Sequence, residues 1–156
     1  MRKRYERSAR GDRRKELIMN VEVEVEEEIT FSRKDLSGGN GSQDDPIVIT
    51  LDIANFTVHK VLVDNGSSAN IIFQDILKRM VLEDASLSLV QTLLVGFGGS
   101  EVTSLGTIDL PVLMGKEPRR RTTMVRFLVV DTPFAYNVIL GRPGLNLFRA
   151  VVSTYH

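Results

Sequence analysis

The sequence contains no cysteine, and this absence removes several kinds of site at once. Without thiols the chain can form neither disulfide bonds nor thiolate zinc sites, and it has no cysteine nucleophile. Imidazole groups are almost as scarce, because the chain has only His59 and His156. We therefore expect neither a histidine-based catalytic triad nor a multi-histidine metal centre.

Long apolar runs are also missing from the sequence. No run approaches the roughly 20 residues that a membrane-spanning helix needs. The amino-terminal residues are basic but are not followed by the apolar segment of a secretory signal. We therefore expect an intracellular, cytoplasmic protein without a membrane partner.

Net charge is zero as well, with 20 basic and 20 acidic side chains in 156 residues, but the charges are unevenly distributed. Residues 2–15 are strongly basic, residues 22–28 are acidic, and residues 37–45 are rich in turn-forming residues. Such segments bury too little apolar surface to offset the entropy of ordering. This pattern predicts a charged, largely disordered linker at 1–45 and one domain at 46–156. The basic run 2–15 is the one candidate contact for nucleic acid, and a solvated tail is the simpler interpretation that we favour.

From Pro46 onward, short apolar segments alternate with glycine, proline and other turn residues, which predicts an all-β domain. A hairpin is expected from strands at 47–53 and 59–63 around a turn at 54–56. Further strands are expected at 92–95, 102–105, 107–113, 123–130, 137–140 and 150–154, and helices at 73–80 and 142–148. Many short strands with little helix indicate a closed barrel or sandwich.

One segment places an aspartate on a turn between two apolar runs: Val61 to Ile72 reads VLVDNGSSANII, with Asp64 followed by Asn65-Gly66. Taken alone, these residues favour an ordinary hairpin turn, because Asn-Gly tolerates positive φ at both positions. Two further features change the interpretation. A glycine-rich segment follows at 96–99, and a glycine at 141 ends the apolar segment 138–140. Each of these is, by itself, typical of a plain turn or a buried strand.

In this order the three features resemble the retropepsins, the aspartic proteases of retroviruses and retrotransposons. The resemblance covers about residues 46–154 and implies a half-pepsin closed β-barrel with one or two short helices. Three longer strings are similar to the protease region of plant gypsy-type long-terminal-repeat retrotransposon gag-pol polyproteins: VLVDNGSSANIIF, LLVGFGGSEVTSLGTIDLPV and YNVILGRPGLNLFRAVVSTYH. The resemblance implies a polypeptide substrate, such as the element's own polyprotein, and neither metal nor organic cofactor.

The resemblance also implies a role for individual residues. The implied roles are the catalytic residue, Asp64; the active-site loop, Asn65, Gly66 and Ser67; the substrate-binding flap, Gly96, Phe97, Gly98 and Gly99; and the loop packing behind the aspartate, Ile139, Leu140 and Gly141. Aspartic proteases need two carboxylates that share one proton. This chain has one such motif and is too short for two lobes, so we expect a homodimer with one aspartate from each copy.

The sequence departs from the family pattern directly after the aspartate. Retropepsins have threonine or serine there, with a hydroxyl that hydrogen-bonds across the dimer, whereas this chain has Asn65. An amide can also donate and accept hydrogen bonds, so a substitute network is chemically feasible. The alternative is a catalytically inactive relic of the fold that acts as a dimerisation or peptide-binding module.

Overall fold

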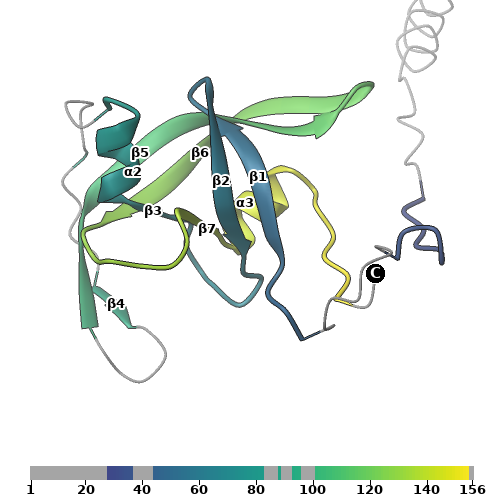
Figure 1. Ribbon diagram of the computed structural model, residues 1–156, viewed down its shortest axis with the longest axis horizontal. Helices are drawn as coiled ribbons and strands as arrows, with labels where there is room; N and C mark the ends of the chain where they lie inside the picture. The colour runs from purple at the N-terminus through teal and green to yellow at the C-terminus, as the bar shows by residue number, and fades with distance from the viewer. Residues whose placement is uncertain (1–27, 37–43, 83–87, 89–92, 96–100, 155–156) are drawn as a thin grey trace, which may run out of the picture. The chain divides into compact units, whose positions relative to one another are not determined.

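A computed structural model describes residues 28–36, 44–82, 88, 93–95 and 101–154 (Figure 1). The chain divides into two units, residues 1–35 and 36–156. In the first unit the described residues contain one short turn, in which the Ser32 amide and hydroxyl donate to the Asp35 carboxylate at 2.8 and 2.9 Å. The predicted basic run 2–15 lies outside the described residues.

The second unit is built mainly from strands, which close into a barrel (Figure 1). The hydrogen-bonded order is β1-β2-β7-β3-β6-β5-β4, and β1 also pairs with β5. The first six strands of this order therefore form a closed ring, with β4 attached to β5 outside it. The elements of this unit are β1 (Val48–Ile53), β2 (Phe56–Val63), β3 (Ile71–Phe73), α2 (Gln74–Arg79), β4 (Leu93–Val95), β5 (Glu101–Lys116), β6 (Arg119–Val130), β7 (Val138–Leu140) and α3 (Arg142–Leu147). The prediction of an all-β closed barrel or sandwich with one or two short helices is confirmed, and the structure has the barrel and two helices.

The core follows from the alternation of apolar and polar residues along the strands. Along β6, Val125, Phe127 and Val129 are fully buried while the residues between them are not. This period of two directs one face of each strand into the barrel. Burying each such side chain contributes roughly 2 kcal/mol relative to leaving it in water.

In the described part of the chain, no helix has the length and apolar character to cross a membrane.

The first hairpin is tighter than predicted. Ile53 pairs with Phe56, so the turn consists of only Ala54 and Asn55. Both residues have positive φ, 49° and 67°, as the type I′ turn of a two-residue hairpin requires. Strand β2 therefore begins at Phe56, three residues before the predicted start.

The predicted break at Gly106 is wrong, because β5 continues through it from Glu101 to Lys116. The register with β6 shifts between Ser104 and Gly106, which is the mark of a β-bulge. Gly106 has a φ of 156°, so it absorbs the irregularity without ending the strand. A glycine in a strand segment can therefore mark a bulge as well as a strand end.

The strand predicted at 150–154 is also wrong, because these residues form no strand in the structure. Val151 is 58% exposed, and no described strand of the chain pairs with this segment. An apolar segment forms a strand only where another strand pairs with it, and none of the described strands does so here.

Candidate active site

The position of Asp64 follows from the strand order. Strand β7 lies between β2 and β3, parallel to β2 and antiparallel to β3. The loop 64–70, which joins β2 to β3, must therefore pass around the carboxyl end of β7. The hairpin-turn alternative is wrong, because β2 and β3 are not neighbours and neither Asn65 nor Gly66 has positive φ.

Asp64 is the first residue of this loop and is held by its own neighbours. Its backbone amide donates to the Leu140 carbonyl at 3.0 Å, which continues the pairing of β2 with β7 by one residue. Its side-chain Oδ1 accepts the Gly66 amide at 2.9 Å, and its carbonyl accepts the Ser67 amide at 3.2 Å. Two interactions orient the backbone and one orients the carboxylate. Asp64 itself is partly buried and follows the last residue of β2, at the edge of the barrel.

The rest of the loop is closed by a contact within it and by contacts with the residues that follow β7. The Arg142 amide donates to the Ser67 carbonyl at 3.0 Å, and the Ser67 hydroxyl donates to the Ala69 carbonyl at 2.9 Å. A Cβ on Gly141 would lie 2.2 Å from the Ala69 carbonyl oxygen, which no side chain can occupy. Glycine at 141 is thus required by the close crossing of two backbone segments.

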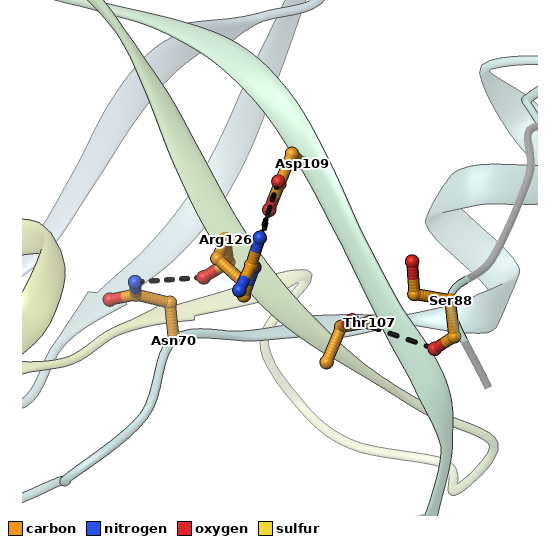
Figure 2. A network of polar contacts seen from close by, with 5 residues as sticks. All are labelled: Asn70, Ser88, Thr107, Asp109 and Arg126. Carbon is orange, nitrogen blue, oxygen red and sulfur yellow. Dashed lines mark hydrogen bonds and ion pairs between the residues drawn. The ribbon is translucent and has the colours of Figure 1, made fainter. Parts of the chain in front are cut away.

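Asn70 is the residue of this site that sequence reasoning missed (Figure 2). It is only 3% exposed, and its Oδ1 accepts the amides of Gly141 and Gly144 at 3.0 and 3.1 Å. Its Nδ2 donates to the Arg126 carbonyl at 3.0 Å, the contact drawn in Figure 2. One side chain thereby joins the end of the Asp64 loop to the turn after β7 and to β6. The available signal was an amide placed directly before the apolar segment Ile71–Phe73.

The other predicted site residues fall in three places. Asn65 is exposed at the outer part of the loop, and Ile139 is partly buried beside β2. Leu140 is fully buried and supplies the carbonyl that binds the Asp64 amide. The flap residues 96–99 lie outside the described residues, although the strands on either side pair, with Val95 opposite Glu101.

An ion pair lies on the outer surface of β5 and β6, of which β6 carries the Arg126 carbonyl that binds Asn70 (Figure 2). Asp109 of β5 and Arg126 of β6 are opposite in register, and two hydrogen bonds of 2.8 Å join them. The hydrogen bond from Arg126 lowers the pKa of Asp109 below its ordinary value. Both side chains are largely exposed, so water screens this pair.

Among the described residues, no group of three or more histidine or acidic side chains could hold a metal ion.

Three solved structures are similar to this chain. The EIAV protease complexed with the inhibitor HBY-793 is 22% identical, over 80% of this chain and 99% of that one, with a TM-score of 0.49. A retropepsin-like aspartic protease from Rickettsia conorii is 19% identical, over 67% and 72%, with a TM-score of 0.48. The retroviral protease-like domain of Ddi1 from Leishmania major is 21% identical, over 66% and 77%, with a TM-score of 0.46. No protein-family model matches the chain, and no curated protein matches it.

Proposed function

We propose that this chain is an aspartic endopeptidase of the retropepsin type that acts as a homodimer on polypeptides. The observation that carries the proposal is the setting of Asp64. A partly buried carboxylate stands at the end of a barrel strand, on a loop that is hydrogen-bonded to itself and to the residues after β7. Such a support holds a reactive group in a fixed place, as catalysis requires.

The chemistry follows from bringing two such carboxylates together. Two like charges a few ångströms apart cannot both persist, so the pair holds one proton. The ionised Asp64 takes a proton from a water molecule, which attacks the peptide carbonyl, while the protonated Asp64 donates a hydrogen bond to the carbonyl oxygen. The described part of the chain supplies one loop of this kind, so the second comes from another copy related by a two-fold axis.

Two exposed features support a dimer around this site. Asn65 is exposed next to Asp64, where its amide can donate and accept hydrogen bonds across the two-fold axis. The second feature is Val151, an apolar side chain that is 58% exposed. A second copy that packed against Val151 would remove this side chain from water.

The substrate is proposed to be an extended peptide, bound as a strand over the two Asp64 side chains. The segment Gly96, Phe97, Gly98 and Gly99 is proposed as the flap that closes over it and excludes water. The similarity of the longer strings to plant gypsy-type elements supports the element's own gag-pol polyprotein as the natural substrate.

The test is cleavage of a peptide library by the purified chain at mildly acidic pH, over a range of protein concentrations. We expect a rate that rises faster than linearly with concentration, because the active species is a dimer. Asp64→Asn should lower the rate at least about 100-fold. Asp75→Asn is the matched control, since Asp75 is an exposed carboxylate on α2 and should leave the rate unchanged. No cleavage by a folded protein, or full activity in Asp64→Asn, would refute the proposal.

A second candidate function is favoured by Asn65, which stands where the family has a threonine or serine. On this alternative the fold persists as an inactive dimerisation or peptide-binding module. Asn65→Thr separates the two, because it restores the family's hydroxyl at that position. Cleavage that appears only in Asn65→Thr would support the inactive module, whereas cleavage by the natural sequence would exclude it.

A further inference from the structure

The outer end of the β5–β6 hairpin is strongly basic. Residues 116–121 read KEPRRR, with Lys116 and three consecutive arginines against the single acid Glu117, a net charge of 4 − 1 = +3. All six residues are exposed. The chain as a whole has a net charge of zero, so this charge is concentrated at one place on the described surface. We call residues 116–121 the basic tip.

The basic tip projects beyond the closed part of the barrel (Figure 1). Strand β1 pairs with β5 only at Val112 and Leu113, and β3 pairs with β6 only from Leu128 onward. The ribbon beyond Leu113 therefore consists of β5 and β6 alone, and Figure 1 shows it reaching past β1. Three residues, Met114–Lys116, separate Leu113 from the turn, which corresponds to a projection of roughly 10 Å.

The register distributes the cations over both faces of this ribbon. Lys116 is opposite Arg119 and Met114 is opposite Arg121, so Lys116, Arg119 and Arg121 share one face. Arg120 lies on the other face. There it lines a cavity of about 340 Å³, and Asp52 is another of the residues that line this cavity. Its guanidinium lies 3.9 Å from the Glu117 carboxylate. Three of the four cations therefore lie on one face of the ribbon, and one lies on the other.

We propose that the basic tip binds nucleic acid by entering the major groove of a duplex and contacting the phosphates on both sides. The groove of B-form DNA is about 12 Å wide and about 8.5 Å deep and admits a two-stranded ribbon, which matches the projection of the tip. Guanidinium groups bind phosphate through paired N–H donors. Cations on both faces suit a groove with two phosphate walls better than a flat anionic membrane. The contact is with the backbone and is independent of base sequence.

The test is binding of the full chain to a fluorescent 20-base-pair DNA duplex at several salt concentrations. For four phosphate contacts, affinity should fall about 100-fold between 50 and 200 mM salt. Replacing Arg119, Arg120 and Arg121 together by glutamine should weaken binding at least about tenfold and reduce the slope of log affinity against log salt by about 2.7. The matched control removes the same charge from the amino-terminal run, by replacing Arg2, Lys3 and Arg4 with glutamine, and should have the smaller effect.

Several outcomes would overturn the proposal. They are no binding by the natural sequence, loss of binding in the amino-terminal variant alone, and preference for polyglutamate over the duplex, which would indicate an acidic protein partner. Exposed arginines on an edge strand also discourage aggregation, so the glutamine variant is checked by sedimentation. If it aggregates, Arg121→Glu serves instead and should weaken binding at least about fivefold. Unchanged binding in that folded variant would also refute the proposal.

Discussion

Replacement of Asn70 by alanine should destabilise this protein far more than the same replacement of Asn137, which is less buried. The Asn70 side chain is almost completely buried and makes three hydrogen bonds, two as acceptor and one as donor. Alanine would leave the amides of Gly141 and Gly144 and the Arg126 carbonyl without this partner. Water cannot easily replace it, because both glycines are themselves buried.

The magnitude follows from these contacts. A protein hydrogen bond contributes about 1 kcal/mol net, and a buried group left without a partner costs about 1–3 kcal/mol. Three bonds therefore place the loss at about 3 kcal/mol or more. The total free energy of unfolding of a domain is of the order of 5–15 kcal/mol, so this change is a large fraction of it.

The measurement is chemical unfolding of both proteins at one fixed protein concentration, because dimerisation would make stability depend on concentration. Asn137→Ala is the control, since Asn137 is only partly buried and its amide makes one hydrogen bond, to the His59 carbonyl at 2.7 Å. It should cost about 1 kcal/mol. A loss below about 1 kcal/mol for Asn70→Ala, or equal losses for the two variants, would refute the idea that Asn70 clamps the loop.

Two further predictions concern the glycines of the site and the Asp109–Arg126 ion pair. Gly141→Ala should lower both the melting temperature and the proposed cleavage rate, because the added Cβ would lie 2.2 Å from the Ala69 carbonyl oxygen. Gly66→Ala should have a milder effect, since the atom nearest to its Cβ is the Asp64 Oδ1, at 3.2 Å. The pKa of Asp109, followed by NMR titration, should lie below that of an ordinary aspartate and return to it in Arg126→Gln. A lowered carboxyl pKa means that the pair stabilises the fold above the ordinary pKa and loses this effect as pH falls through the lowered one. Unchanged titration in Arg126→Gln would contradict this assignment.

The Asp64 loop and the basic tip lie on the same domain but depend on different physics. The loop depends on short-range hydrogen bonds and on close backbone contact, both of which are insensitive to salt. The basic tip depends on charge, so its contribution should decrease as salt increases. Cleavage assays and duplex binding therefore test the two proposals separately, and the failure of one leaves the other standing.

Periodicity in the sequence was sufficient for the class of fold and for most of the strands. The alternation along 123–130 and the isolated apolar segments 47–53 and 138–140 are local signals, because side chains on a strand alternate between core and solvent. Local signals failed where a distant partner decides. Gly106 lies within a continuous β5 because β6 supports a bulge there. Residues 150–154 form no strand because none of the described strands pairs with them.

The same division applies to the candidate site. The sequence alone placed Asp64 on a turn between apolar runs and associated it with Gly141, 77 positions later. Only the tertiary structure decided that β7 lies between β2 and β3, so that the loop must pass around the end of β7 and Gly141 must be a glycine. It also decided that Asn70 is a buried clamp, because its partners lie 56 to 74 residues away along the chain. Contacts at that distance arise from packing, and no local pattern of residues encodes them.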